Sequence, residues 1–384
     1  MRILHTSDWH IGRTFHGNST MDALAEVLEA LTVQVSEHSV DVVIVAGDVF
    51  DSATPAGPAY TLLGDALVAL HETGARVIVT SGNHDSAARL GFQARLLRDG
   101  IHVLTDPLAI GTPVTVLDAD GPVHFFGIPY LEPAIVRQHW SGAELRTQAQ
   151  TLAHAMDLVR GGMAEHVGRS VAIAHCFSAG VDATVGLERE VRQGGLDLVP
   201  LTVFDGPDYV ALGHIHGRQQ VSERVRYSGA PLHYSFGEQN KPRGSWLVEL
   251  DATGLASVEW LDLPVPRRLV TLTGTLDEIL SSENVAAHAG DWVCAVYTDA
   301  LAQTEPMRRL RERYPHCAMV QHQPSENSET IERSYVERLR GAVTDPERIE
   351  AFLEHVRSGH GATEREAELI RDVLDDRVRA EALV

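Results

Sequence analysis

The sequence contains little cysteine and almost no lysine. Its three cysteines are odd in number and form no Cys-x-x-Cys pair, which argues against a disulfide framework and against a zinc ribbon. Lys241 is the only lysine. A P-loop needs a lysine after its glycines to reach the outer phosphates of a nucleotide, and Lys241 does not lie in such a motif. Any dependence on ATP would therefore come from a partner.

Long apolar runs are also missing from the sequence. No run approaches the roughly 18 apolar residues of a membrane-spanning helix, and the first residues include no apolar segment of the length found in signal peptides. These features predict a soluble, cytoplasmic protein with no membrane partner.

Basic residues are few compared with acidic ones. The 384 residues include 53 Asp and Glu but only 32 Lys and Arg, which gives a formal net charge of −21. Taken alone, this charge argues against nucleic acid as a partner. The length is enough for two or three domains with a large core.

The first part of the sequence alternates short β-branched runs with amphipathic helices. Strands are predicted at residues 3–4, 42–45 and 77–79, and helices between them at residues 21–35 and 55–71. Strands that alternate with helices in this way indicate an α/β fold, with a sheet that carries helices on its faces.

Further strands are predicted at residues 123–128 and 171–174. Three more, at residues 209–212, 226–228 and 246–250, follow with short connections. Because short connections suit antiparallel pairing, we expect these three strands to belong to a second, partly antiparallel sheet.

The pattern changes at the proline-containing segment Leu263–Arg268, where we place a domain boundary. The sequence is thereby divided into a domain of residues 1–266, a small α/β module of residues 267–343 and two helices in residues 344–384. The two helices could pack on their own domain or dock on the helices of a partner, and the sequence leaves both possibilities open.

Candidate metal ligands gather in five short motifs, each of which follows a predicted strand. Ligands of open α/β sheets bind outside the carboxyl ends of the strands, so we expect these motifs to meet at one edge. The motifs are Ser7–His10, Gly47–Asp51, Gly82–Asp85, Ala174–Cys176 and Gly213–His216.

Two of these motifs have the spacing of paired metal ligands. Asp8 and His10 are two residues apart. In an extended loop their side chains would point to the same side and could hold one ion. His214 and His216 repeat the same spacing after another strand.

Three further residues complete a set of seven ligands. Asp48 has two carboxylate oxygens and can bridge two ions, Asn83 offers a carbonyl oxygen, and His175 offers a ring nitrogen. Seven oxygen and nitrogen ligands without sulfur are too many for one tetrahedral zinc ion. Two divalent ions of octahedral type fit better. Manganese is the first choice for both, followed by iron, magnesium or zinc.

The series D-x-H, G-D-x-x-D, G-N-H-D, an isolated His and G-H-x-H resembles the calcineurin-like metallophosphoesterases. The segments Met1–Gly12, Val45–Asp51, Ala211–His216 and Tyr227–Glu238 are similar to those of the nuclease subunits of bacterial SbcCD-type complexes, which repair double-strand breaks. The resemblance implies an α/β fold in which two sheets form a sandwich with helices on both faces. It also implies a small α/β capping domain and C-terminal helices.

The resemblance assigns the candidate residues to separate roles. It implies a first ion held by Asp8, His10, Asp48 and His216. It implies a second ion held by Asp48, Asn83, His175 and His214. His84 would not bind metal but would donate a proton to the leaving oxygen or stabilise the transition state, and a histidine suits this task near neutral pH.

The activity implied by the resemblance is that of a metal-dependent DNA phosphodiesterase, an exonuclease on duplex ends and an endonuclease on single strands and hairpins. The implied partners are an SbcC-type coiled-coil ATPase, bound through the C-terminal helices, and a second copy of the chain, bound through helices near residues 57–71 and 86–98. The chain would associate with the nucleoid during repair. The alternatives are a small-molecule or protein phosphoesterase on the same fold, which the capping domain disfavours, and a non-catalytic scaffold, which the complete ligand set disfavours.

Residues beside the motifs leave several roles open. Asp51 could position DNA or brace the proton donor. Arg13 and His16 could contact phosphate or simply lie on the surface. His5 and Asp85 are expected to support the ligands rather than to bind metal.

Two bound divalent ions would change what the net charge implies about DNA binding. They would supply positive potential at the point where phosphate must lie, so the charge of −21 does not exclude DNA. The acidic remainder predicts that the isolated chain binds duplex DNA weakly without metal.

Overall fold

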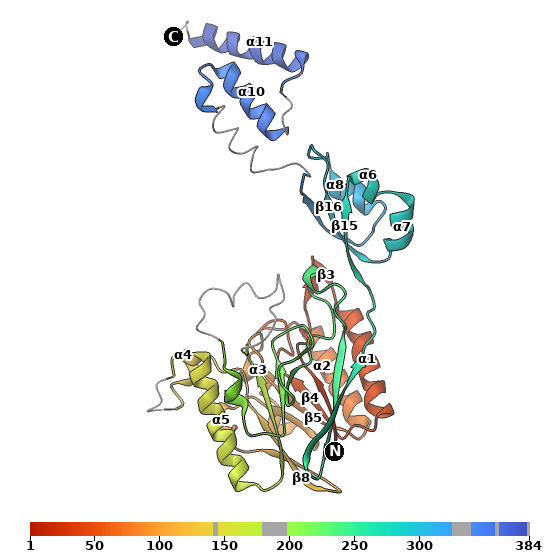
Figure 1. The fold of residues 1–384 in the computed structure, drawn as a ribbon, viewed down its shortest axis with the longest axis vertical. Coiled ribbons are helices and arrows are strands. Elements are labelled where there is room, and N and C mark those ends of the chain that lie inside the picture. The colour runs from red at the N-terminus through yellow and green to blue at the C-terminus, as the bar shows by residue number, and fades with distance from the viewer. Residues whose placement is uncertain (141–144, 179–197, 325–338, 358–360, 382–384) are drawn as a thin grey trace. The chain divides into compact units, whose positions relative to one another are not determined.

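The computed structural model describes residues 1–140, 145–178, 198–324, 339–357 and 361–381. Contacts within the chain divide it into two compact units, Met1–Arg268 and Leu269–Val384 (Figure 1). The subdivision of the second unit into a capping domain and partner-binding helices stays a prediction.

A six-stranded sheet forms one layer of the first unit. Four of its strands run parallel, and three of these, β1, β4 and β5, are almost entirely buried, as expected for strands covered on both faces. Two antiparallel strands extend the sheet beyond β1. The strand order is β14 (Gly254–Asp262), β13 (Gly244–Asp251), β1 (Arg2–Thr6), β4 (Val42–Ala46), β5 (Arg76–Thr80) and β6 (Ile101–Leu104).

A second six-stranded sheet forms the next layer. Its four central strands run parallel, and an antiparallel strand pairs at each edge. The strand order is β11 (Gln219–Gln220), β12 (Val225–Tyr227), β10 (Tyr209–Gly213), β9 (Arg169–His175), β8 (Gly121–Gly127) and β7 (Val114–Asp118).

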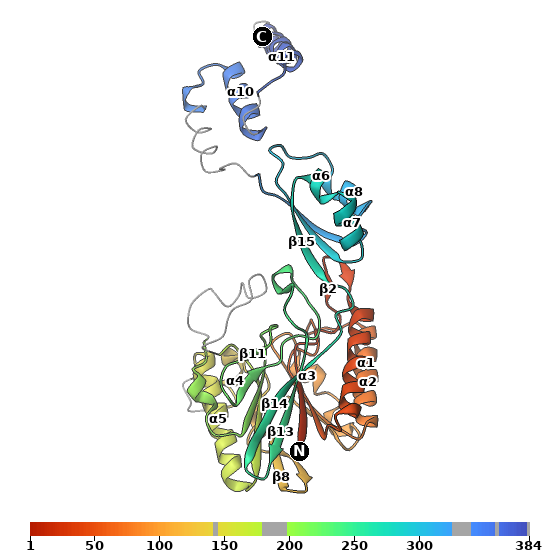
Figure 2. The ribbon, with the colours of Figure 1, turned by 45° about the vertical axis from the view of Figure 1, so that its right-hand side comes forward.

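The two sheets pack face to face, and helices cover their outer faces (Figure 1; Figure 2). Between the sheets lies an apolar layer that includes Ile44 and Val171. The apolar sides of α1 (Met21–Glu37) and α2 (Gly57–Glu72) pack against the first sheet. The apolar side of α5 (Gln148–Glu165) packs against the second sheet. The predicted fold, an α/β sandwich of two sheets with helices on both faces, is confirmed.

One strand lies in a different sheet from the one predicted. The strand expected at residues 246–250 does not join the second sheet, because β13 pairs antiparallel with β1. The other two strands of the expected group, β10 and β12, pair with each other in parallel. The hairpin of β13 and β14 covers the edge that β1 would otherwise expose, and it places Trp246 and Val248 in the layer between the sheets.

Short elements occupy several of the loops that follow the strands. They are β2 (Thr14–Phe15) and β3 (Asn18–Ser19) after β1, α3 (Ala87–Leu90) after β5, and α4 (Pro133–Val136) after β8.

The second unit begins with a small three-stranded parallel sheet. Its strands are β15 (Leu269–Gly274), β16 (Trp292–Tyr297) and β17 (Cys317–His322), and its helices are α6 (Leu276–Ile279), α7 (Ser282–His288) and α8 (Pro306–Arg311). A separate apolar core, which includes Val293, Leu310 and Tyr314, holds these elements together.

Two helices, α10 (Asp345–Val356) and α11 (Glu364–Glu381), follow in the second unit. Thr344 and Glu347 form a capping box at the start of α10, and Arg357 forms an ion pair with Glu366 at 2.8 Å. Within the described parts of the chain, no helix is long and apolar enough to cross a membrane.

Candidate metal centre

The loops after the parallel strands hold several predicted ligands in an uncommon backbone conformation. Asp8, His10, Asp48 and His214 have φ angles of 55°, 46°, 48° and 102°, which lie in the left-handed region that residues with a Cβ rarely adopt. Such a conformation is costly and persists only where the surrounding structure imposes it. Four of the seven predicted ligands share this conformation, so the backbone strain is concentrated in the loops that carry the candidate site.

Two glycines allow these loops to approach each other closely. A Cβ on Gly82 would overlap the carboxylate of Asp48, and a Cβ on Gly213 would overlap the carbonyl oxygen of Ala46. A side chain at either position would push apart the strand ends from which the ligands come.

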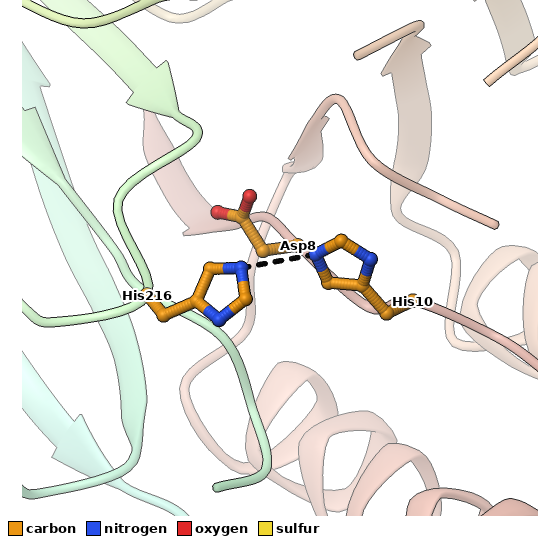
Figure 3. A group of neighbouring side chains, drawn as sticks. All are labelled: Asp8, His10 and His216. Carbon is orange, nitrogen blue, oxygen red and sulfur yellow. Dashed lines mark hydrogen bonds between the residues drawn. The ribbon is translucent and has the colours of Figure 1, made fainter. Parts of the chain in front are cut away.

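Asp8, His10 and His216 form one group of candidate ligands (Figure 3). One donor atom from each residue lies within 4.8 Å of the others, and all three residues are buried. Asp8 and His10 come from the loop after β1, whereas His216 comes from the loop after β10. The group therefore joins the two sheets. The Nε2 atoms of His10 and His216 face each other at 3.0 Å.

Asp48, His175 and His214 form a second group with the same close spacing. Asn83 belongs to this group, because its Oδ1 lies 3.1 Å from Nε2 of His175 and 3.0 Å from Nδ1 of His214. The Oδ2 of Asp48 lies 3.3 Å from Nε2 of His175 and 3.6 Å from Nε2 of His10. The Asp48 carboxylate is thus situated between the two groups, and the structure brings all seven predicted ligands together.

The surroundings of His175 show that these donors suit a cation. Its Nδ1 lies 2.9 Å from the carbonyl oxygen of Ala46, so Nδ1 carries the hydrogen. In the neutral ring the Nε2 lone pair then faces two further acceptors, Oδ2 of Asp48 and Oδ1 of Asn83. Burial lowers the pKa of His175, but the negative charge of Asp48 raises it, to about 9 overall. A proton, or a metal ion in its place, relieves the repulsion among the three acceptors.

Asp48 carries the negative charge that such a cation requires. Burial alone would raise the pKa of its carboxyl group, but the neighbouring His175 and His10 hold that pKa well below its usual range. A buried, ionised carboxylate is the group expected to bridge two divalent ions.

His10 is oriented by Asp51 and Arg13. The Nδ1 of His10 lies 3.3 Å from Oδ1 of Asp51, and the same oxygen accepts a hydrogen bond of 2.9 Å from Arg13. A carboxylate behind a ligand histidine fixes the ring orientation and increases its basicity. The carboxylate of Asp51 thus contacts the ligand His10 and Arg13, whereas the predicted proton donor, His84, contacts only the backbone carbonyl oxygen of Asp51.

His216 has a similar support that the sequence analysis did not identify. Its Nδ1 lies 3.5 Å from Oε1 of the fully buried Glu238, which forms an ion pair of 2.9 Å with the equally buried Arg243. Arg243 also donates to the carbonyl oxygen of His216. Glu238 ends the segment Tyr227–Glu238, which is similar to the family named above. An isolated Glu followed five residues later by Arg does not have the spacing of a ligand pair, so no role could be assigned to Glu238 from the sequence.

His84 is fixed beside the ligands through its backbone and one ring nitrogen. The backbone N–H of His84 donates to Oδ1 of Asp48 at 2.9 Å, and its ring Nδ1 lies 3.0 Å from the carbonyl oxygen of Asp51. The neutral ring therefore donates from Nδ1 and keeps Nε2 for another partner. The ring packs edge-on against His10, with centroids 4.8 Å apart.

Asp85 and His5 are held by the protein itself. The carboxylate of Asp85 accepts hydrogen bonds from the backbone N–H groups of Val49, Phe50 and Gly82, which joins the two ligand loops. Burial, together with the charge of Asp48, raises the pKa of Asp85 to about 6. His5 contacts the hydroxyl of Tyr209 and the carbonyl oxygen of Leu212. Neither residue belongs to a candidate ligand group within the described structure.

Two protein-family models match the chain. The model described as "Calcineurin-like phosphoesterase" matches residues 1–218, which include all seven candidate ligands and His84. The model SbcD_C, described as "Type 5 capsule protein repressor C-terminal domain", matches residues 265–357.

Solved structures with partial similarity include three proteins of low sequence identity. A Thermus thermophilus protein is 11% identical, with a TM-score of 0.38, and the match covers 68% of this chain and 98% of that one. A dimetal phosphatase from Danio rerio is 15% identical, with a TM-score of 0.40 and the same coverage. GAP50, the anchor in the inner membrane complex of Plasmodium, is 10% identical, with a TM-score of 0.40, covering 85% of this chain and 98% of that one.

Proposed function

Since the chain belongs to the calcineurin-like phosphoesterases, a family of metal-dependent enzymes with a dimetal centre, we propose that it is a DNA phosphodiesterase of the SbcD type. It acts as an exonuclease on duplex ends and as an endonuclease on single strands and hairpins, in association with the nucleoid in the cytoplasm. The observation that carries the proposal is the convergence of Asp48 and six other residues with oxygen or nitrogen donors, from five loops. The match of residues 265–357 to the SbcD_C model supports the SbcD type.

The ligand groups suggest how two ions would be held. Asp8, His10, Asp48 and His216 would hold the first, and Asp48, Asn83, His175 and His214 would hold the second. Manganese suits this mixture of carboxylate, amide and imidazole donors without sulfur. When bound, such ions lower the pKa of a coordinated water and offset the charge of a phosphate.

His84 is the group proposed to act on the leaving oxygen. Its backbone and Nδ1 are fixed by Asp48 and Asp51, which leaves Nε2 for the substrate. A 3′-oxygen that leaves a phosphodiester needs a proton, and His84 would give it one from Nε2 when the ring carries a proton on both nitrogens, as an imidazolium. His84 also lies in a candidate ligand group with His10 and Asp48, and we propose it as a catalytic residue rather than a metal ligand.

The C-terminal helices are the proposed binding surface for an SbcC-type coiled-coil ATPase. Phe352 and Val356 on α10 are each 50% exposed, and Leu369 and Val373 on α11 are 49% and 67% exposed. Apolar residues that lie at helical spacing and remain exposed suit docking on partner helices.

A second copy of the chain is proposed to bind at α2 and the segment around α3. Tyr60, Phe92 and Leu96 are 42%, 79% and 83% exposed, and Tyr60 and Phe92 line an apolar cavity of about 570 Å³. A homodimer would cover these residues, and the mass of the isolated chain in solution, measured by light scattering, tests this: a monomer would contradict it.

The proposed activity is tested with purified protein, manganese, linear duplex DNA, hairpin DNA and bis(4-nitrophenyl) phosphate. The wild-type chain should cleave all three only with metal, and Asp48→Ala should cleave none. His84→Ala should slow DNA cleavage by about 100-fold or more but affect the nitrophenyl ester less, because nitrophenolate leaves without a proton.

Three other outcomes of this test have separate meanings. Absence of metal-dependent DNA cleavage, with and without the ATPase, would contradict the proposal. Cleavage of the nitrophenyl ester alone would indicate a small-molecule or protein phosphoesterase. Absence of any cleavage would indicate a scaffold.

A further inference from the structure

A cavity of about 410 Å³ opens beside the second ligand group. Asn83 and His214 form part of its wall, so the cavity begins where the second ion is proposed to bind. The remaining wall comes from α4, the start of α5 and the residues just after β9. Its volume suits one small ligand or one nucleotide but not a double helix.

Two aromatic side chains of the cavity lie next to ligand histidines. The ring of Phe177 packs edge-on toward His214, with centroids 6.3 Å apart, and the ring of Tyr130 packs edge-on toward His175 at 6.4 Å. Both aromatic residues are only partly buried. Aromatic faces of this kind stack on nucleobases without regard to sequence.

Polar groups complete the lining. Arg137 and Arg146 are exposed and lie on the side of the cavity formed by α4 and the start of α5. Glu132, an acidic residue, also lines it. Gln148 is only 8% exposed, and its Oε1 has no hydrogen-bond partner within the described structure. A buried amide oxygen without a partner costs free energy unless a ligand donor reaches it.

We propose that this cavity binds a single unpaired nucleoside of the substrate strand. Its base would lie against Phe177 and Tyr130, its own phosphate would lie at the proposed ions, and the adjoining phosphate would lie at Arg137 and Arg146. This inference rests on the proposed function, because it assigns the cavity to the strand that the ions cleave. A paired base is stacked inside the duplex, so the nucleotide must leave the stack before it enters. That requirement favours strand ends, hairpin loops and single strands.

Equilibrium binding in the presence of manganese tests the assignment without turnover. The probes are inorganic phosphate, thymidine 5′-monophosphate and thymidine 3′,5′-bisphosphate, measured by calorimetry on the full chain. The nucleoside and the second phosphate should each improve binding by about tenfold, because base stacking and an arginine–phosphate contact are each of that order.

Two variants separate the contributions, and a third serves as control. Phe177→Ala should abolish the gain from phosphate to the monophosphate. Arg137→Ala should abolish only the gain from the monophosphate to the bisphosphate. Arg224→Ala, an exposed arginine in the same unit, should behave like the wild type. Unchanged phosphate binding would show that the variants remain folded.

The inference is overturned if the wild type binds all three probes equally, or if Phe177→Ala and Arg137→Ala both keep the wild-type gains. Failure of the proposed function gives a different result. In that case the wild type would not cleave DNA with manganese, while the three binding constants would still decide whether the cavity takes a nucleoside.

Discussion

At the residue scale, the polar atoms of His175 and Asp48 repel one another unless a positive charge lies between them. The Nε2 of His175 faces Oδ2 of Asp48 at 3.3 Å and Oδ1 of Asn83 at 3.1 Å. In the protein without metal, a proton on His175 supplies that charge. Metal binding should therefore compete with protonation of this residue.

The first prediction concerns that competition. The pKa of His175 is raised to about 9, so the residue is protonated at pH 7.5 and must lose its proton to bind metal. Manganese binding should release about one proton at pH 7.5 and almost none at pH 10. Calorimetry in buffers of different ionisation enthalpy measures this number. Equal proton release at the two pH values would contradict the role of His175.

A second prediction concerns Glu238, which supports His216. Replacing the carboxylate by an amide in Glu238→Gln removes the charged partner of the imidazole, so manganese should bind about 10- to 100-fold more weakly. Glu223→Gln, in which the replaced side chain is exposed, is the control. If thermal stability fell while manganese affinity stayed the same, Glu238 would serve only to neutralise Arg243.

His5 gives a third prediction, for stability against acid. Burial lowers the pKa of His5 from 6.5 to about 3. The stability gained from its neutral form is complete above pH 6.5 and is lost as pH falls toward 3, by up to about 1.4 kcal/mol per pH unit. In metal-free protein, His5→Gln should flatten the dependence of the free energy of unfolding on pH between 6.5 and 4 by about one proton. Urea denaturation at several pH values measures it, and parallel curves would argue against it.

The seven candidate ligands could be proposed from sequence because each lies within three residues of a strand end or in a recognisable pair. The role of Glu238 could not be predicted, because it depends on the position of His216 in the folded chain, and His216 lies 22 residues earlier in the sequence. The same holds for the bond between His84 and the carbonyl oxygen of Asp51, because a backbone acceptor has no sequence signature.

At the scale of elements, buried strands and long helices were the easiest to predict. The strands β1, β4 and β5 are short β-branched runs, and α1 has a complete apolar stripe. The edge strands β7 and β14 are largely half-buried or exposed, so their sequences lack a continuous apolar pattern. The sheet to which β13 belongs depends on which edge is left open after the parallel strands have paired, and local sequence does not contain that information.

The helix α10 provides the fourth prediction. Phe352 and Val356 lie one helical turn apart and are half-exposed, so Phe352→Ser with Val356→Ser should weaken binding of the SbcC-type ATPase at least tenfold by removing apolar contact area. Arg348→Ala on the same helix is the matched control. Gel filtration of the full chain with the partner measures complex formation, and cleavage of bis(4-nitrophenyl) phosphate should not change. Wild-type affinity in the serine variant would exclude α10 as the binding surface.

At the scale of the whole molecule, the net charge is negative, whereas the charge expected at the proposed metal centre is positive. The chain carries a net charge of −21, while two divalent ions would add positive charge at the ligand groups. Long-range electrostatics should therefore repel DNA, and only the immediate surroundings of the ions should attract it.

This contrast gives the fifth prediction. Without metal, the isolated chain should bind a linear duplex weakly, and manganese should increase affinity by about tenfold or more, because it supplies the missing positive potential. Fluorescence anisotropy of a labelled duplex, with chelator and with manganese, measures both states at one salt concentration. Tight binding in the presence of chelator would show that a basic surface of this chain recognises DNA without the ions.

The joining of the two sheets by one ligand group has a consequence during protein synthesis. His10 and His216 are 206 residues apart in the chain, yet their Nε2 atoms meet at 3.0 Å. When only the parallel strands of the first sheet have been synthesised, the nascent chain contains Asp8, His10, Asp48 and Asn83. It does not yet contain His214 or His216. The half-made polypeptide therefore lacks part of the ligand set proposed for each ion, so the proposed nuclease activity would arise only after the second sheet has been made.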